Sequence, residues 1–464
     1  MTADLTFTSA VDALSGFADG SLSPVELMTA VLDNEDAHGA LTQRYADEAL
    51  AAAKTAEARW HSGDARPLEG LPVAIKEDKG VEGKPTSAGS LVWKDAIAGG
   101  DAPPVAAIKA AGGIVHARTN VNEMGTAGIT GGRLFPPTSN PYNTEYNSLG
   151  SSGGAAVALA TGLTTLANGS DYCGSIRLPS SANAVVGFKP SRGRNAVGAY
   201  FNLDWYDHDG PMARSVNDCA LLQNSMAGQQ AGDLFSRPDW TPLSPVAPDP
   251  STLSIALSTN LGFATVAPDV EREIRAMAER LSAAGANVVE VDLGWNEECL
   301  WAFRTHAAAI FAGWAAAYLE TDRDDMTRYA IAFAETAHSL TAIDFARSME
   351  IETGMWDMLA PTLTTFDALL CPTSSVPSVL LDHDPAGDPI NVMGHSLAAD
   401  FGWMLTWPFN MLSALPVMGI PAGLADSGVP IGAQLVGRPF DDHRVFDIGR
   451  LIESTSPPVG TFAR

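Results

Sequence analysis

The sequence predicts an α/β fold in which helices flank a central sheet. Two observations lead to this prediction: apolar runs of strand length alternate with helical segments, and 46% of the 464 residues are hydrophobic. The clearest alternation runs from a strand at 71–75 through a helix at 105–111 to a strand at 114–117, which is the order of a β-α-β unit. No repeat, long linker or low-complexity tract divides the sequence, so we expect a single domain over 1–464.

Caps and composition predict the elements of the first half. Ser23, Pro24 and Glu26 form a capping box with proline at the first helical position, which indicates the start of a helix. The small apolar residues of 155–161 suit a tightly packed helix. The other elements expected here are a helix at 47–60 and strands at 163–168 and 185–190.

Periodicity predicts the elements of the second half. Apolar residues recur at helical spacing over 268–284, which indicates an amphipathic helix. The segment 301–347 is mostly helical in pattern and rich in aromatic residues, and we expect a helical insertion in the domain near 295–360. The remaining expectations are an irregular connection at 233–249 and strands at 254–257, 288–291, 369–373 and 417–421.

Charge and composition exclude several classes of function. The net charge is −26, from 54 acidic and 28 basic residues, and a negative field of this size repels phosphate backbones, so a nucleic-acid partner is not expected. The four cysteines are dispersed, and there is no H-E-x-x-H or phosphate-loop motif, so we expect no disulfide scaffold, metal or cofactor. Without a signal peptide or membrane span, the expected location is the cytoplasm; monomer and homodimer both stay open.

Two glycine-serine segments carry the clearest chemical signal. The first is 150–154 and the second is 169–179, with Ser151 and Ser175 as their key hydroxyls. Glycine lets the backbone bend into conformations that other residues avoid. A hydroxyl beside a run of N–H groups supplies a nucleophile and a place to hold an oxyanion, which is what acyl transfer requires.

The base for such a hydroxyl is harder to find. Nine histidines are scattered along the sequence, and none has a motif context. Lys76 directly follows the apolar run 71–75. Burial disfavours the charged form of an ammonium group, so a buried lysine can act as a base in its neutral form. From this pattern alone, a lysine at the surface end of a strand is the favoured interpretation.

The motifs, taken in order, resemble those of the amidase signature hydrolases. The resemblance is dense over about 70–220 and holds over about the last 100 residues. It implies an α/β/α architecture with a central mixed, twisted sheet, and hydrolysis of a C–N bond in a small molecule. The matching segments are 71–78, 139–143, 150–154, 171–179, 187–190, 209–216, 409–410 and 428–437.

The resemblance also implies a role for each matching residue. Ser175 would be the nucleophile, Ser151 the bridging serine on a cis peptide bond, and Lys76 the base that draws a proton through Ser151. The oxyanion would be held by the backbone N–H groups of Tyr172, Cys173, Gly174 and Ser175. Ser152 and Ser170 would tie the loops together, and Asp171 and Arg177 would orient the second loop. Cys173 departs from the glycine usual at its position, and we do not expect it to be a nucleophile.

The substrate and two rival functions complete the predictions. A hydrophobic, aryl substrate is suggested by the aromatic residues Tyr200, Phe201, Trp205 and Tyr206, and amide, carbamate (urethane) and ester bonds all present the same carbonyl. One rival is the A subunit of a tRNA-dependent amidotransferase, which hydrolyses glutamine inside a complex. The other is a Ser-His-Asp esterase with Ser152 as nucleophile, because 150–154 also fits G-x-S-x-G.

Overall fold

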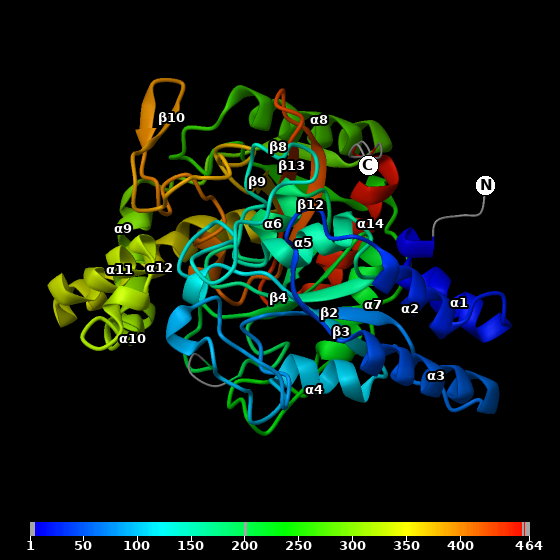
Figure 1. Ribbon diagram of the computed structural model, residues 1–464. Coiled ribbons are helices and arrows are strands. Elements are labelled where there is room, and N and C mark those ends of the chain that lie inside the picture. Colours follow the sequence, from blue (N-terminus) through cyan, green and yellow to red (C-terminus); the bar gives the residue numbers. More distant parts are fainter. Residues whose placement is uncertain (1–4, 199–201, 457–458, 460–464) are drawn as a thin grey trace.

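The computed structural model describes residues 5–198, 202–456 and 459, and within them one large mixed sheet with eleven strands forms the centre of the molecule (Figure 1). The sheet confirms the predicted α/β class. Its strands, in spatial order, are β1 (Leu41–Arg44), β3 (Ile114–Thr119), β2 (Pro72–Lys76), β4 (Leu166–Ser170), β6 (Asp209–Ala213), β5 (Val186–Lys189), β12 (Val417–Leu424), β13 (Pro430–Gly437), β9 (Ala368–Pro372), β7 (Ser254–Leu257) and β8 (Asn287–Glu290).

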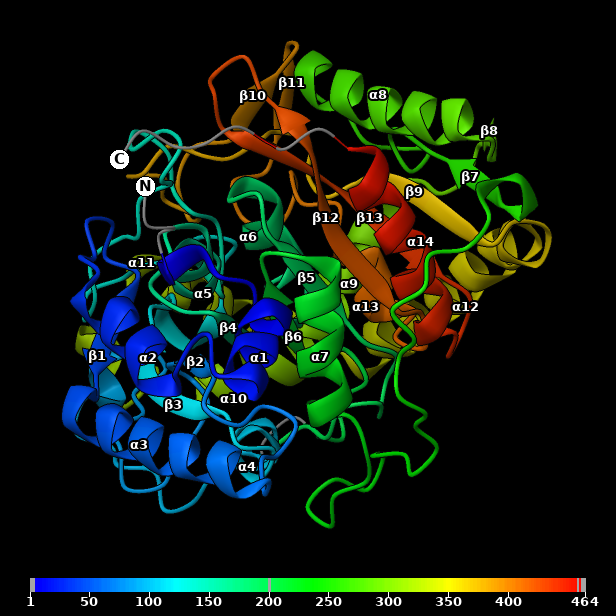
Figure 2. The same cartoon turned by 90° about the vertical axis from the view of Figure 1, so that its right-hand side faces the viewer.

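Helices cover both faces of this sheet. In Figure 2, α3, α7, α8 and α14 lie in front of the sheet, whereas α5, α9 and α12 lie behind it. The front helices are α1 (Ala10–Asp19), α2 (Pro24–Asp33), α3 (Ala46–Ser62), α4 (Pro103–Ala110), α7 (Val216–Met226), α8 (Pro268–Ala284) and α14 (Asp442–Thr455). The others are α5 (Gly153–Ala160), α6 (Arg177–Ala182), α9 (Glu298–Ala307), the π-helical turn η5 (Ala308–Ala312), α10 (Gly313–Ala316), α11 (Arg328–Glu335), α12 (Ala342–Thr365) and α13 (Pro408–Met411).

Strand direction decides where the serine and lysine segments meet. β2 runs parallel to both β3 and β4, with Val73 opposite Leu166. Because parallel neighbours end at the same edge of a sheet, the residues at the carboxyl ends of β2 and β4 come together. These residues are Lys76 and Ser170.

Two local sequence signals are confirmed by the structure. The Ser23 side chain accepts the N–H of Glu26, and the Glu26 carboxylate accepts the N–H of Ser23, so α2 begins with the predicted capping box. The amphipathic helix α8 spans Pro268–Ala284 as expected, with its apolar residues buried against the sheet.

Helix α5 is buried along its whole length, and its small residues allow this. A Cβ at Gly154 would lie 2.3 Å from the Asn120 backbone nitrogen and 2.5 Å from the Ala40 carbonyl oxygen. Glycine is therefore required where α5 crosses the neighbouring backbone. This close packing fixes the position of the first serine segment, whose last two residues begin α5.

A buried histidine makes a prediction about the pH dependence of stability. Burial lowers the pKa of His116, in β3, from 6.5 to about 3. As pH falls from 6.5 to 4, the unfolded chain gains this proton and the folded protein does not, so the free energy of unfolding falls by roughly 3 kcal/mol from this group. Glutamine at this position can keep the contact to Thr164. In urea titrations at several pH values, we therefore expect the free energy of unfolding of His116→Gln to fall less between pH 6.5 and 4 than that of the parent protein.

The exposed His61, in α3, provides the matched control. His61→Gln should leave the pH dependence of unfolding unchanged. An equal acid sensitivity in His116→Gln and the parent protein would contradict the assignment to His116.

Candidate active site

Lys76 lies at the end of β2 and is fully buried. Its Nζ lies 2.7 Å from both Ser151 Oγ and Ser170 Oγ. Its backbone N–H donates to Asn168 Oδ1 in β4, which fixes the strand end. Of the two interpretations of this lysine, the structure shows the buried one.

Ser151 lies in a backbone segment that glycine makes possible. The Gly150–Ser151 peptide bond is cis, as the resemblance implies. A Cβ at Gly150 would lie 1.8 Å from the carbonyl oxygen of Ile129, so no other residue fits at this position. The first serine segment is therefore built around a close backbone approach.

The two serine segments are joined by backbone hydrogen bonding. The Ser152 N–H donates to the Ser175 carbonyl oxygen over 3.1 Å, and the Ser152 hydroxyl donates to the Ser170 carbonyl oxygen over 3.4 Å. Ser151, Ser170 and Ser175 all line one cavity of about 680 Å³. Among the described residues no hydrogen bond joins the Ser151 and Ser175 hydroxyls, and contacts of this kind commonly tighten only when substrate is bound.

The turn at 171–176 has two kinds of N–H group. Those of Gly174 and Ile176 donate to the two carboxylate oxygens of Asp171, over 2.8 and 3.2 Å. Those of Cys173 and Ser175 donate no hydrogen bond within the described part of the chain. The expectation that Gly174 contributes an N–H to the oxyanion is therefore corrected: Asp171 already uses this group.

Asp171 and Arg177 form a buried ion pair that shapes this turn. Arg177 donates to both carboxylate oxygens of Asp171, over 2.8 and 2.9 Å. Burial alone would raise the pKa of Asp171, but the charge and hydrogen bonds of Arg177 hold it below its usual value. Arg177 also reaches Asn410 and Gln434, so the turn is tied to the C-terminal motifs.

Cys173 lies within the turn as a neutral thiol. Burial and the neighbouring Asp171 carboxylate raise its pKa to about 12. The thiolate is the reactive form of cysteine, and it is not populated at neutral pH with such a pKa. This agrees with the expectation that Cys173 is not a nucleophile.

Asp78 is a charged neighbour of Lys76 that the sequence reasoning missed. Its Oδ2 lies 3.2 Å from Lys76 Nζ and accepts the Ser170 hydroxyl, also over 3.2 Å. Burial alone would raise the pKa of Asp78, but the charges of Lys76 and Lys79 lower it. The signal for Asp78 in the sequence is its position two residues after Lys76, at the end of the matching segment 71–78.

Comparison with known proteins identifies the family of this site. The family profile described as Amidase matches residues 26–446. The chain belongs to the amidase signature family. An acylamidase of Rhodococcus erythropolis is 32% identical over 98% of this chain and 96% of its own length. The A subunit of the glutamyl-tRNA(Gln) amidotransferase of Anaeromyxobacter dehalogenans is also 32% identical, covering 97% and 96%.

Solved structures agree with this assignment. A bacterial aryl acylamidase of the amidase signature family superposes with a TM-score of 0.91 at 26% identity, covering 97% of this chain and 96% of that one. The protein is therefore an amidase signature enzyme that hydrolyses amide C–N bonds. In the described part of the amidase, none of the helices is long and apolar enough to cross a membrane.

The cavity of this amidase has an aromatic wall that the sequence did not reveal. The ring of Tyr172 lies 5.1 Å from Phe311, and Trp93 lies 5.3 Å from Trp314 and 5.1 Å from Tyr318. All five residues line the cavity beside Ser175. The wall joins the 3₁₀ turn η2 (Leu91–Trp93), the second serine segment, and the helical turns η5 and α10 with the residues that follow them, so only the folded chain assembles it.

The residues predicted for the substrate pocket lie elsewhere. Tyr206 is fully buried behind Tyr172, with ring centroids 5.6 Å apart, and Trp205 packs against Tyr206. Neither residue lines the cavity, which corrects the prediction for both. Tyr200 and Phe201 lie outside the described residues.

In the described part of the chain, no histidine forms a hydrogen bond with Ser151, Ser152 or Ser175. His306 Nε2, in α9, lies 2.8 Å from Asp204 Oδ1 in the connection between β5 and β6, and this contact is buried. His383 Nε2 lies 3.0 Å from the Ala399 carbonyl oxygen. The Ser152 hydroxyl donates to the Ser170 carbonyl oxygen, whereas the nucleophile of a Ser-His-Asp esterase would donate to a histidine.

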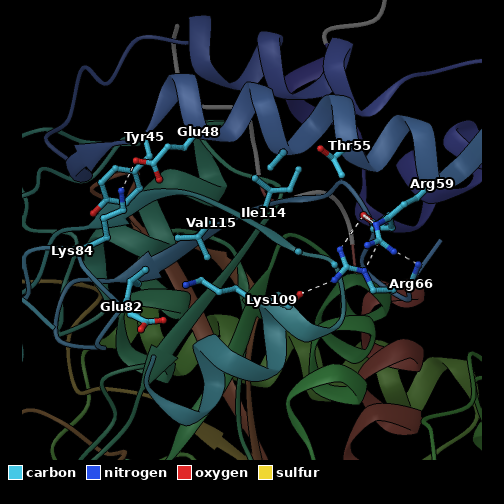
Figure 3. A pocket seen from close by; sticks show the side chains of 15 residues that line it. Tyr45, Glu48, Thr55, Arg59, Arg66, Glu82, Lys84, Lys109, Ile114 and Val115 are labelled. Atoms are coloured by element: carbon cyan, nitrogen blue, oxygen red, sulfur yellow. Dashed lines mark hydrogen bonds and ion pairs between the residues drawn. The ribbon is translucent and has the colours of Figure 1, made fainter. Parts of the chain in front are cut away.

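A second cavity, between α3 and α4, is separate from the serines of this amidase (Figure 3). Its volume is about 440 Å³. Its charges pair with carboxylates nearby: Arg66 binds Glu69 and Lys84 binds Glu48. Among the described residues that line this cavity there is none of Lys76, Ser151 and Ser175, so we do not assign the catalytic chemistry to it.

Proposed function

We propose that this amidase cleaves aryl amides and aryl carbamates through an acyl-enzyme on Ser175, with Lys76 and Ser151 moving the proton. The observation that carries the proposal is the 2.7 Å contact of the buried Lys76 Nζ with Ser151 Oγ, in the cavity that Ser175 lines. A lysine in this position reaches one serine directly and acts on the other through it.

In the first half of the reaction, Ser175 Oγ attacks the substrate carbonyl carbon. Its proton passes to Ser151 Oγ while Ser151 gives its own proton to Lys76 Nζ, a step that requires this amine to have lost a proton first. The N–H groups of Cys173 and Ser175, which have no partner among the described residues, are the donors we assign to the oxyanion. The C–N bond then breaks, and the proton returns through Ser151 to the leaving nitrogen.

In the second half, water attacks the acyl-enzyme carbonyl. The water proton travels through Ser151 to Lys76, and the ester bond to Ser175 breaks as Ser175 regains a proton. A carbamate substrate that loses its amine in the same steps releases a carbonate half-ester instead of a carboxylic acid. An ester presents the same carbonyl, so we also propose esterase activity.

The aromatic wall supports an aryl substrate over glutamine. Large apolar faces favour flat rings, whereas a small amino acid needs charged contacts at both ends. The amidotransferase function stays the second candidate because a relative of that name is as similar in sequence as the acylamidase. An esterase with a histidine base has no support from the contacts of His306 and His383.

A hydrolysis panel tests this proposal directly. It compares aryl amides, aliphatic amides, aryl carbamates, esters and glutamine on the purified chain. We expect aryl amides and carbamates to give the highest kcat/KM and glutamine to release no ammonia above background. Glutamine turnover above that of the aryl substrates would replace this proposal with the amidotransferase function.

Trp314 should set the preference for aryl substrates. It lies in α10 and lines the cavity beside Phe311. We expect Trp314→Leu to lower kcat/KM for an aryl amide about 5- to 30-fold, mainly through KM, because a ring contact of about 1–2 kcal/mol is lost. An aliphatic amide should change less than about threefold.

Trp301 provides the matched control for Trp314. It lies in α9, is 37% exposed and does not line the cavity. Trp301→Leu should leave both substrates unaffected. An equal loss for aryl and aliphatic amides in Trp314→Leu would show that the wall supports the fold and does not select the substrate.

A further inference from the structure

One part of the catalytic cavity is polar and strongly acidic. Asp78, Asp101 and Asp207 line it, and the fully buried Asp209 lies close by. The only cavity-lining cation in the described residues is Lys79. This polar part borders the serines as well, so a bound substrate would touch both it and the aromatic wall.

The carboxylates around Asp207 already have partners. Asp78 binds Lys76 and Ser170, and Asp101 binds Lys109 at 2.7 and 2.9 Å. Asp209 lies 2.8 Å from Lys79 Nζ. Asp204 accepts the Tyr172 hydroxyl and contacts His306, each at 2.8 Å.

Asp207 differs from all of them. Within the described residues its carboxylate makes no hydrogen bond and no ion pair, although it lines the cavity. Lys79 already pairs with Asp209, so the Asp207 carboxylate is available to a ligand bound in the cavity. A carboxylate in a recess without a partner is costly unless a proton or a bound cation neutralises it.

We propose that Asp207 selects substrates that carry a primary ammonium group away from the scissile bond. This inference rests on the proposed hydrolysis of aryl amides and adds a second recognition element to it. The ammonium would lie against the Asp207 carboxylate, while the aryl ring lies against the aromatic wall. The overall charge of −26 favours the approach of such a cation.

The electrostatics around Asp207 agree with this role. Burial raises its pKa to about 7; Lys79 opposes the shift, and the carboxylates of Asp209, Asp204 and Asp78 add to it. Asp207 is then mostly protonated at pH 6 and mostly ionised at pH 8. The preference for an ammonium substrate over a neutral one should therefore increase as the pH rises from 6 to 8.

The test uses pairs of aryl amides that differ in one group. One member carries an aminomethyl, aminoethyl or aminopropyl group on the ring, and the other carries the matching hydroxyalkyl group. At pH 8 we expect the parent enzyme to prefer one ammonium member by at least tenfold in kcat/KM. Asp207→Asn should remove this preference through KM, while the hydroxyalkyl substrates change less than about threefold.

Two variants and one inhibitor keep the result interpretable. Asp101→Asn removes a carboxylate of the same cavity that Lys109 already neutralises, so it should keep the preference. Asp207→Glu retains the charge and should keep most of it. Benzylamine should inhibit the parent enzyme more strongly than benzyl alcohol, and Asp207→Asn should abolish the difference.

Distinct outcomes overturn the inference and the function. If the hydroxyalkyl amides are hydrolysed but the ammonium members gain nothing, or if Asp207→Asn affects both members equally, the role of Asp207 is wrong and the aryl amidase function stands. If neither member is hydrolysed by the parent enzyme while other substrates are, the proposed function itself fails.

Discussion

Ser175→Ala should reduce kcat for an aryl amide by about 10⁵- to 10⁶-fold, with KM nearly unchanged. The substitution removes the only group assigned to form the acyl-enzyme, while the N–H groups of the turn and the aromatic wall stay in place. The residual rate should be the rate that substrate binding and the oxyanion contacts alone can support. Steady-state hydrolysis and mass spectrometry of the trapped acyl-enzyme measure both effects.

Ser152→Ala is the informative comparison for Ser175→Ala. Ser152 lies in the neighbouring segment and donates its hydroxyl to the Ser170 backbone, so its loss should cost far less activity. Covalent labelling with an aryl carbamate should appear on Ser175 in the parent enzyme. Label on Ser152, together with activity in Ser175→Ala, would contradict the assignment of the nucleophile.

Lys76→Met should lower kcat by about 10²- to 10⁴-fold, the usual size of a general-base contribution. Methionine keeps most of the length of the buried side chain and removes the amine that takes the proton. The fold should survive, because the backbone N–H of this residue still donates to Asn168. Circular dichroism melting checks this before kinetics are compared.

Substitutions of Ser151 and Ser170 distinguish a serine that relays the proton from one that only positions Lys76. Both hydroxyls lie 2.7 Å from Lys76 Nζ, so they differ in role and not in distance. Ser151→Ala should cost nearly as much as Lys76→Met, since the proton path to Ser175 is lost. Ser170→Ala should cost less than about tenfold, since Asp78 still holds Lys76. A loss in Ser170→Ala as large as in Ser151→Ala would place the relay on Ser170 instead.

Sequence reasoning worked best where the signal is local. The capping box of α2 and the apolar stripe of α8 depend on residues within one or two turns, so both helices were predicted correctly. It missed β6, with the sequence Asp-Gly-Pro-Met-Ala, and gave no strand at 430–437, where β13 runs. Glycine and proline weaken the pattern of a strand, and these strands form because neighbours on both sides pair with them.

The sequence by itself determined the family, the α/β class and the chemical groups: the two serine segments and one lysine after an apolar strand. Short motifs carry this information because glycine is needed wherever backbones touch, as at Gly150. Only the tertiary structure decided that Lys76 reaches Ser151 and Ser170, that Asp171 takes the N–H of Gly174, and that the wall contains Trp93 and Trp314. These contacts join residues far apart in the chain, and strand pairing and helix packing, which leave no local pattern, bring them together.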